Sequence, residues 1–335
     1  MAETAVAPAP LLTVEGLAKS YLIRRRDLLR QHVVGEIRAV NDISFTLAAG
    51  ETLSIVGESG CGKTTAARSI LHLVEPTAGD IRLDGADVRA TFGRDRRSEV
   101  LALRRKMQYV FQDPYLSLNP RWSIRQILTE PLRVHGHVPQ ARWDAEVEAL
   151  LDRVGLPADY AERYPHELSG GQRQRIGIAR ALAVDPRLLI CDEPVSSLDV
   201  SVRAQVLNLL AELQEELGLA YLYISHDLGS VRFLSNRIAV MYLGNLVEVG
   251  TVDEIFDRPR HHYTAALIAA VPTPDPAAHG RRATVTGEAP SVLQRPSGCA
   301  FHTRCPAALP VCERETPVLA APNGETHSFA CHNPR

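Results

Sequence analysis

The sequence lacks any long apolar run. None of its windows holds the roughly 18 consecutive apolar residues that a membrane-spanning helix requires, and the longest candidates, around Ala265–Val271 and Leu219–Ile224, are far too short. We therefore expect any membrane contact to be made through a partner protein. The first residues, from Met1 to Pro8, also lack the basic start and apolar core of a signal peptide. We expect the chain to stay in the cytosol, where thiols are kept reduced.

A strong net charge is missing as well. The chain of 335 residues carries 37 Lys and Arg against 39 Asp and Glu, a formal net charge of −2. This balance gives no general electrostatic reason to bind nucleic acid. The hydrophobic share of 45% is that of an ordinary globular protein, and it suffices for the core of one large or two moderate domains.

A glycine-rich stretch, residues 57–64, stands between an apolar run and a helix-compatible run. Its letters, Gly-Glu-Ser-Gly-Cys-Gly-Lys-Thr, form a complete phosphate-binding P-loop. Glycines bring backbone amides against phosphate oxygens, and the following helix N-terminus adds partial positive charge. We expect Lys63 to reach the outer phosphates and Thr64 to offer its hydroxyl to Mg²⁺. The predicted nucleoside triphosphate site contains Gly57, Glu58, Ser59, Gly60, Cys61, Gly62, Lys63, Thr64 and Thr65.

Two predicted strands end in groups that triphosphate chemistry needs. Met107–Phe111 alternates like a strand and must end before the next proline, which places Gln112 at its mouth, where its amide can reach water or metal. Leu188–Cys191 is apolar throughout, as in a strand buried on both faces, and it leads directly into Asp192 and Glu193. Buried carboxylates are costly unless they meet a cation. We therefore assign the first to Mg²⁺ and the second to orienting the attacking water.

A second anion site is expected about a hundred residues after the first, at Leu-Ser-Gly-Gly-Gln, residues 168–172. Ser169 can cap the helix that follows, and Gly170 and Gly171 expose amides at its positive end. Downstream, the strand Ala220–Ile224 leads to His226. Because ligands of open α/β sheets lie outside the carboxyl ends of the strands, we expect this histidine to face the terminal phosphate.

The remaining segments give a coarse layout. Short strands are predicted at residues 12–17 and 43–47, and a basic segment separates them. Residues 24–30 of that segment are expected to form a solvated loop, or else to contact anionic lipid or a neighbouring subunit. Residues 77–85 have the glycines of a hairpin, and residues 122–183 are mostly helical in pattern. Further helices are predicted at Glu146–Val154, which stops at Gly155, and at Val202–Leu217, which follows Ser197-Leu198-Asp199.

Together these motifs resemble the ATP-binding cassette (ABC) ATPases, in order and at fitting spacings over roughly residues 10 to 335. The resemblance implies a dimer in which ATP lies between the P-loop of one subunit and the Ser169-Gly170-Gly171-Gln172 segment of the other. It also implies that Tyr21 stacks on adenine, that Gln112 faces a transmembrane partner, and that Asp199 couples the two sites. No expected motif is missing, so we expect ATP hydrolysis.

The fold that the resemblance implies is α/β, an ABC-type P-loop NTPase with a mixed central sheet, an antiparallel β-subdomain and a helical subdomain. We place the ATPase domain at residues 10–257 and its helical subdomain at about 113–183. A short extension that contains four cysteines follows at 258–335.

The tail narrows the resemblance. Residues 261–267 and 296–306 are similar to the C-terminal extension of oligopeptide and dipeptide importer ATPases, a group that includes nickel and glutathione importers. The basic insertion after Tyr21 and residues 39–45 are similar to the second of the two ATPases that such importers often carry, so a heterodimer is expected. The implied partners are a second ABC ATPase, two transmembrane permease subunits and an extracytoplasmic substrate-binding protein. The chain would then sit on the cytoplasmic face of the membrane.

The six cysteines form two groups. Cys61 and Cys191 are expected to be ordinary small apolar residues, although Lys63 and the helix start could lower the pKa of Cys61. The other four lie in the Pro-rich tail, where a reducing compartment favours metal over disulfides. Their spacing lacks the Cys-x-x-Cys pairs of most zinc sites, and the tail resemblance favours a [4Fe–4S] cluster over zinc or uncoordinated thiols. The predicted ligands are Cys299, Cys305, Cys312 and Cys331.

Two other functions compete with that of a peptide importer. A soluble cassette ATPase that acts on nucleic acid or ribosomes usually joins two cassettes in one chain, whereas this chain has one P-loop and one Leu-Ser-Gly-Gly-Gln. A cassette kept for assembly without turnover would not need Glu193 and His226. We therefore expect an active importer ATPase that uses ATP and Mg²⁺.

Overall fold

The computed structural model of the chain describes residues 9–26, 31–93, 97–270, 290, 291, 293, 295–322 and 326–335, with the backbone alone for 25, 26, 31 and 114. The chain divides into two compact units. The helical unit comprises the described parts of Met1–Thr13, Thr46–Thr52 and Arg82–Ile224. The phosphate-loop unit comprises those of Val14–Phe45, Leu53–Ile81 and Ser225–Arg335. The first eight residues, where we expected no signal peptide, lie outside the described residues.

Parallel strands form the core of the helical unit. β7 (Leu188–Asp192) pairs with β6 (Met107–Val110) on one side and with β8 (Ala220–Ser225) on the other, both in parallel. Every residue of β7 and β8 is buried. A parallel strand covered on both faces has no polar side, which explains the unbroken apolar runs. The three strands confirm the sequence predictions.

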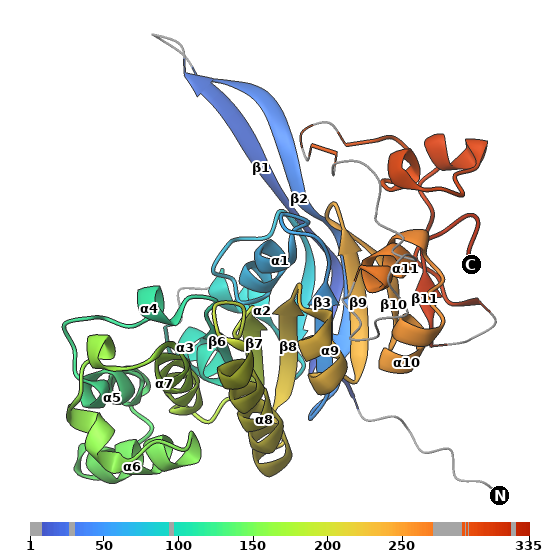
Figure 1. The fold of residues 1–335 in the computed structure, drawn as a ribbon. Coiled ribbons are helices and arrows are strands. Elements are labelled where there is room, and N and C mark those ends of the chain that lie inside the picture. Colours follow the sequence, from blue (N-terminus) through green and yellow to red (C-terminus); the bar gives the residue numbers. More distant parts are fainter. Residues whose placement is uncertain are drawn as a thin grey trace, which may run out of the picture. The chain divides into compact units, whose positions relative to one another are not determined.

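Helices make up the rest of this unit, and α5, α6 and α7 gather together in it (Figure 1). α6 buries Val147, Leu150 and Leu151, and the chain turns away at Gly155, whose φ is +66°. This confirms the predicted amphipathic helix and its glycine stop. The elements of the unit besides its parallel strands are β5 (Ala86–Asp87), α2 (Val88–Phe92), α3 (Arg97–Lys106), α4 (Pro114–Ser117), α5 (Ile124–His135), η1 (Gln140–Arg142), α6 (Trp143–Arg153), η2 (Ala158–Glu162), η3 (Pro165–Glu167), α7 (Gly170–Leu182) and α8 (Val200–Leu217).

In the phosphate-loop unit, β3 (Thr52–Val56) pairs in parallel with β9 (Arg237–Tyr242). β9 turns back into β10 (Asn245–Thr251), and β10 also pairs with β11 (Ser328–Phe329), so the end of the tail adds a strand to this sheet. Other elements of the unit are α1 (Lys63–Ile70), α9 (Leu228–Leu234), α10 (Val252–Asp257), α11 (His262–Ala269), η5 (His302–Arg304) and η6 (Pro310–Glu313).

The N-terminal hairpin differs from the sequence prediction. β1 (Leu12–Arg26) and β2 (Gln31–Leu47) are neighbours in one sheet with β4 (Ala78–Leu83), and they extend far beyond the other strands of their unit (Figure 1). The loop predicted at residues 24–30 is therefore wrong at residues 24–26, which belong to β1, while residues 27–30 lie outside the described residues. Backbone pairing between the two strands sets their length, and the polar run at residues 24–26 carries no apolar alternation from which its strand could be predicted.

The predicted hairpin at 77–85 is confirmed, because β4 pairs with β5 in antiparallel fashion. Within the described residues, no helix is both long and apolar enough to cross a membrane.

Candidate nucleotide-binding site

The P-loop connects β3 to α1, and its glycines are fixed by close backbone packing. Gly57 has φ +155°, and a Cβ there would lie 2.1 Å from the Met241 carbonyl oxygen. Gly62 has φ +111°, and a Cβ there would lie 2.0 Å from the Ala39 carbonyl oxygen. No side chain fits at either position. The sequence therefore needs glycine here to make the turn that presents loop amides.

Lys63 opens α1 and is folded into the loop. The residue is only 5% exposed, and Nζ donates to the carbonyl oxygens of Gly57 at 2.8 Å and Glu58 at 3.0 Å. An ammonium buried at a helix N-terminus places positive charge where phosphate oxygens would bind. Thr64 and Thr65 follow in the first turn of the helix.

The pKa of Cys61 is raised, whereas the sequence suggested that it could be lowered. The residue is buried, with Sγ 3.8 Å from Lys63 Nζ. Burial raises the pKa of this thiol, and the opposing effect of the lysine is smaller. The lowered-pKa hypothesis is therefore wrong. Cys191, in β7, is fully buried and its pKa rises to about 12, as expected for a core residue.

Two further predicted residues lie in the phosphate-loop unit. Tyr21 is 40% exposed on β1, and Lys19 Nζ lies 5.0 Å from its ring centroid. An exposed ring is available for stacking. His226 is exposed directly after β8, next to Asp227, which caps α9 by accepting a hydrogen bond from the Gly229 amide at 3.1 Å.

The helical unit brings Gln112 and the two carboxylates together. Asp192 is 2% exposed and accepts a hydrogen bond of 2.5 Å from the Tyr109 hydroxyl. Glu193 has φ +47°, a conformation that non-glycine residues seldom adopt, and its amide donates to the Ile224 carbonyl at 2.8 Å. Gln112 Nε2 donates to Glu193 Oε2 at 3.0 Å. The strained turn therefore places the Glu193 carboxylate within hydrogen-bond distance of Gln112.

The Leu-Ser-Gly-Gly-Gln segment forms a reciprocal cap at the start of α7. The Gln172 amide donates to Ser169 Oγ at 3.3 Å, and the Ser169 amide donates to Gln172 Oε1 at 2.9 Å. This confirms the predicted N-cap. Ser169 and Gly170 are exposed, whereas a Cβ on Gly171 would lie 2.2 Å from Val202 Cγ1. Gly171 is needed for packing against α8, and Gly170 leaves the helix start open.

Asp199 caps α8, the predicted helix, which begins at Val200. Its Oδ1 accepts from the Val202 amide at 3.0 Å and from the Ser201 hydroxyl at 2.9 Å. The hydrogen bond from the Val202 amide contributes most to lowering the pKa of Asp199. An exposed, ionised carboxylate therefore stands at the start of this helix.

The four tail cysteines share one neighbourhood but form no metal group. The Cys299 amide donates to the Cys312 carbonyl at 2.8 Å, and burial raises the pKa of Cys331 to about 11, with Cys299, Cys305 and Cys312 adding to the rise. Nevertheless, no set of three or more His, Cys, Asp or Glu in the described chain is arranged to hold a metal ion. The structure gives no support to the predicted [4Fe–4S] cluster, and the function proposed below needs none.

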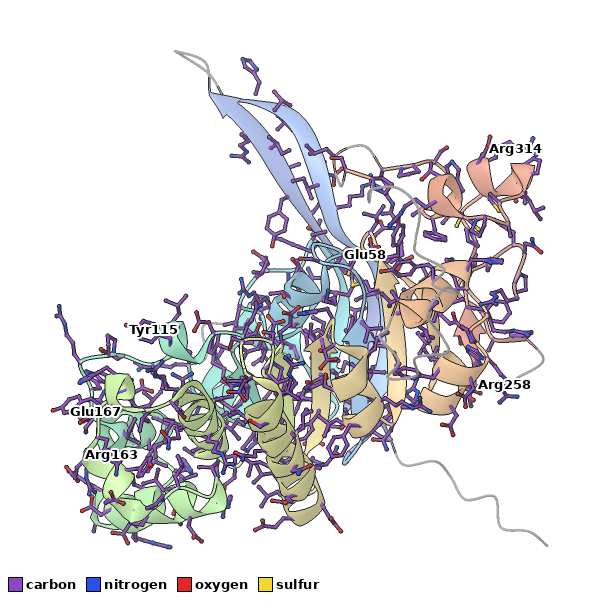
Figure 2. All side chains as sticks on the ribbon, in the orientation of Figure 1. Glu58, Tyr115, Arg163, Glu167, Arg258 and Arg314 are labelled. Carbon is purple, nitrogen blue, oxygen red and sulfur yellow. The ribbon has the colours of Figure 1, made fainter. Side chains whose placement is uncertain are left out.

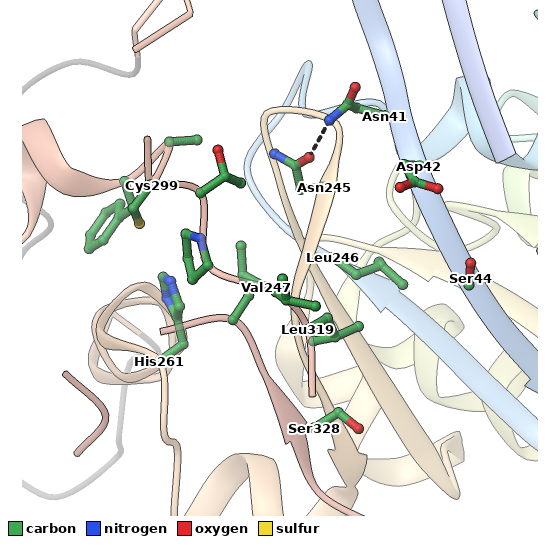
Figure 3. A pocket seen from close by; sticks show the side chains of 16 residues that line it. Asn41, Asp42, Ser44, Asn245, Leu246, Val247, His261, Cys299, Leu319 and Ser328 are labelled. Carbon is green, nitrogen blue, oxygen red and sulfur yellow. Dashed lines mark hydrogen bonds between the residues drawn. The ribbon is translucent and has the colours of Figure 1, made fainter. Parts of the chain in front are cut away.

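A cavity of about 600 Å³ lies beside Cys299 in the phosphate-loop unit (Figure 3). Its walls come from β2, β10 and the tail, and Asn41 Nδ2 donates to Asn245 Oδ1 at 2.8 Å on one side. Cys299 is the one predicted site residue that lines it. The cavity is therefore separate from the loop that holds Lys63.

Sequence reasoning missed two residues that contact the P-loop from the tail. Tyr263 Oη accepts from the Glu58 amide at 2.9 Å, and Arg304 forms two hydrogen bonds of 3.0 Å to the Glu58 carboxylate. Both lie in the tail stretches that carry the family resemblance. No local sequence pattern links them to Glu58, which precedes Arg304 by 246 positions.

Comparison with known proteins agrees with these motifs. The sequence matches the ABC transporter family over residues 40–196 and the C-terminal region of oligopeptide/dipeptide transporters over residues 247–312. It is 50% identical over 322 residues to the probable peptide ABC transporter ATP-binding protein y4tS of Sinorhizobium fredii, covering 96% of this chain and 89% of that protein. It is 48% identical over 333 residues to the oligopeptide transport ATP-binding protein AppF of Bacillus subtilis, covering 98% and 99%.

Solved structures show the same fold. The cassette MJ0796, described as a post-hydrolysis dimer bound to ADP and Pi, is 27% identical with a TM-score of 0.61, covering 72% of this chain and 98% of that one. CbiO1 of Clostridium perfringens, part of the transporter complex cbiONQ, also has a TM-score of 0.61 at 27% identity, covering 74% and 91%. The predicted ABC cassette fold is confirmed. The chain belongs to the ATP-binding proteins of ABC transporters and is an ATPase of that family.

Proposed function

We propose that this chain is the ATP-hydrolysing subunit of an importer for di- and oligopeptides. The observation that carries the proposal is the near full-length identity, tail included, with two proteins named for peptide and oligopeptide transport. Neither is named for nickel or glutathione, so peptides are the favoured cargo. We keep the predicted division into an ATPase domain at 10–257, with a helical subdomain at 113–183, and an extension at 258–335.

The P-loop binds the phosphates in this proposal. Its amides and the Lys63 ammonium neutralise the triphosphate, and Tyr21 offers an exposed ring to adenine. The burial of Lys63 within the loop supports this role, because a fixed cation needs no reordering when an anion binds. His226 is assigned to the terminal phosphate.

Glu193 orients and deprotonates the attacking water. Two observations support this role: its backbone is held in a strained conformation, and Gln112 Nε2 donates to Oε2 of its carboxylate. Gln112 then reports the state of the site to a transmembrane partner, because any movement of its amide changes the hydrogen bond to Glu193.

Thr64, Gln112 and Asp192 would hold Mg²⁺ on the bound nucleotide. The donor chemistry fits, because hydroxyl, amide and carboxylate oxygens are the ligands that Mg²⁺ prefers, and the Gln112 amide oxygen is not used in its bond to Glu193. When bound, Mg²⁺ supplies charge neutralisation of the phosphates. Asp192 remains buried and oriented by Tyr109.

A second cassette completes the ATP site of this chain, because its segment that corresponds to residues 169–172 covers the phosphates. The Ser169-Gly170-Gly171-Gln172 segment of this chain covers the ATP of the second cassette in the same way. The dimeric MJ0796 structures support pairing of such cassettes. Asp199, at the start of α8, couples the two sites. We propose a heterodimer bound to two membrane permease subunits on the cytoplasmic face, with an extracytoplasmic receptor that supplies the peptide.

Uptake measurements in the host test this function. Deletion of the gene should abolish ATP-dependent uptake of a labelled di- or tripeptide, and the wild-type gene, but not Lys63→Ala, should restore it. Nickel and glutathione uptake serve as parallel arms. Unchanged peptide uptake, or loss confined to nickel or glutathione, would reject the peptide assignment.

A further inference from the structure

The tail binds the side chain of a P-loop residue. Arg304, at the end of η5, places Nη1 3.0 Å from Glu58 Oε2 and Nη2 3.0 Å from Glu58 Oε1. This two-pronged geometry is the strongest that a guanidinium and a carboxylate form. The Arg304 side chain is 7% exposed and that of Glu58 is 30% exposed, so water screens the pair only in part.

Every polar group of Glu58 is engaged. Its amide donates to Tyr263 Oη at 2.9 Å, its carbonyl accepts from Lys63 Nζ at 3.0 Å, and its carboxylate is bound by Arg304. Tyr263 belongs to α11 and Arg304 to η5, so two separate parts of the tail hold one loop residue. Figure 2 shows Glu58 at the P-loop.

An aromatic cluster fixes the guanidinium. The rings of Tyr242, Tyr263 and Phe301 lie within 5.4 Å of one another, centroid to centroid, and all three are buried. Arg304 Nη1 also donates to Tyr242 Oη at 3.3 Å. A guanidinium that packs against these rings and donates hydrogen bonds through both Nη atoms has little freedom to turn away from Glu58.

The pairing has an electrostatic consequence for a phosphate site. A free carboxylate in the loop would repel the polyphosphate, and Arg304 cancels that charge. We propose that Arg304 is a positioning residue for ATP, which neutralises Glu58 and fixes the P-loop from the tail. This inference rests on the proposed function, because it concerns the same nucleotide site.

Arg304→Gln tests the proposal in the full-length chain. It leaves the Glu58 carboxylate unpaired beside the phosphates, so we expect the Kd and KM for MgATP to rise roughly tenfold, the effect of one uncompensated charge at a partly screened distance. The kcat should stay within about twofold, because no group proposed to act on the water has changed.

A second substitution separates charge from simple anchoring. Glu58→Gln in the Arg304→Gln background removes the unpaired charge, and we expect it to restore most of the lost MgATP affinity. Glu58→Gln alone leaves the positive charge of Arg304 without its carboxylate partner, so we expect it to lower the Kd for MgATP severalfold, and an unchanged or higher Kd would overturn the proposal. This single variant keeps the proposal testable if Arg304→Gln does not fold.

Arg314→Gln is the matched control. Arg314 is an exposed arginine in the same tail, and it lies well away from Glu58 (Figure 2). We expect no change in Kd or KM. Equal loss in both arginine variants would overturn the proposal, because the effect would then follow net charge.

The outcomes distinguish the two proposals. If wild-type protein neither binds nor hydrolyses MgATP, the proposed function fails. If wild type does both and Arg304→Gln matches it, the role of Arg304 fails alone. A weakened Arg304→Gln that Glu58→Gln does not rescue also overturns it, since Arg304 would then be only a structural anchor.

Discussion

Replacing Glu193 by glutamine isolates the proposed base from its surroundings. Glutamine has nearly the same shape, and its amide oxygen can still accept the hydrogen bond that Gln112 donates at 3.0 Å. The backbone at φ +47° carries the same strain in both proteins. What changes is the ability to take a proton from water.

A positioned general base contributes about 10²- to 10⁴-fold. That factor corresponds to about 2.7 to 5.4 kcal/mol of activation free energy. We therefore expect Glu193→Gln to lose at least 99% of turnover, taking the lower end of that range. MgATP affinity should stay within about threefold, because P-loop contacts are untouched.

Phosphate release measures the turnover, equilibrium binding measures the affinity, and light scattering with ATP measures the pairing of chains. We expect ATP to trap a dimer of the variant. Glu215→Gln, at an exposed position on α8, is the control and should behave as wild type. Turnover of Glu193→Gln within twofold of wild type would refute the assignment.

Three further predictions concern stability and thiol chemistry. Gly171→Ala should destabilise the protein by about 1–3 kcal/mol in denaturant unfolding, because its Cβ would lie 2.2 Å from Val202, whereas Gly177→Ala meets nothing within 4 Å and should be neutral or slightly stabilising. Burial lowers the pKa of His261 to about 4, so the stability that its neutral ring provides is fully present above pH 6.5 and is lost as the pH falls toward 4. His261→Asn should flatten that pH dependence of unfolding, and an unchanged profile would contradict it. Alkylation of Cys331 should accelerate with a midpoint near pH 11, and a midpoint near 8.5 would contradict the raised pKa.

Local patterns predicted the elements that carry the site. The P-loop, the strand before Asp192 and the capped start of α7 are each specified within about ten residues, by glycine, by apolar runs or by a cap. Such signals depend on backbone geometry that neighbouring residues determine. That is why these predictions were confirmed.

Contacts between distant segments could not be predicted. The pair of Glu58 and Arg304 joins residues separated by 246 positions, and the length of the β1–β2 hairpin follows from pairing rather than from periodicity. The nearby Lys63 suggests a lowered pKa for Cys61, but burial, which the sequence does not show, raises that pKa. In each case the tertiary environment outweighs the local signal.

Coupling of ATP turnover to peptide transport is the central claim. It is tested most directly by reconstituting the chain with its membrane partners in vesicles and supplying the receptor with and without peptide. We predict that peptide-loaded receptor raises ATP hydrolysis and drives accumulation of labelled peptide, and that Glu193→Gln abolishes both. An ATP hydrolysis rate that is the same with and without peptide, or peptide accumulation that persists in Glu193→Gln, would contradict this claim.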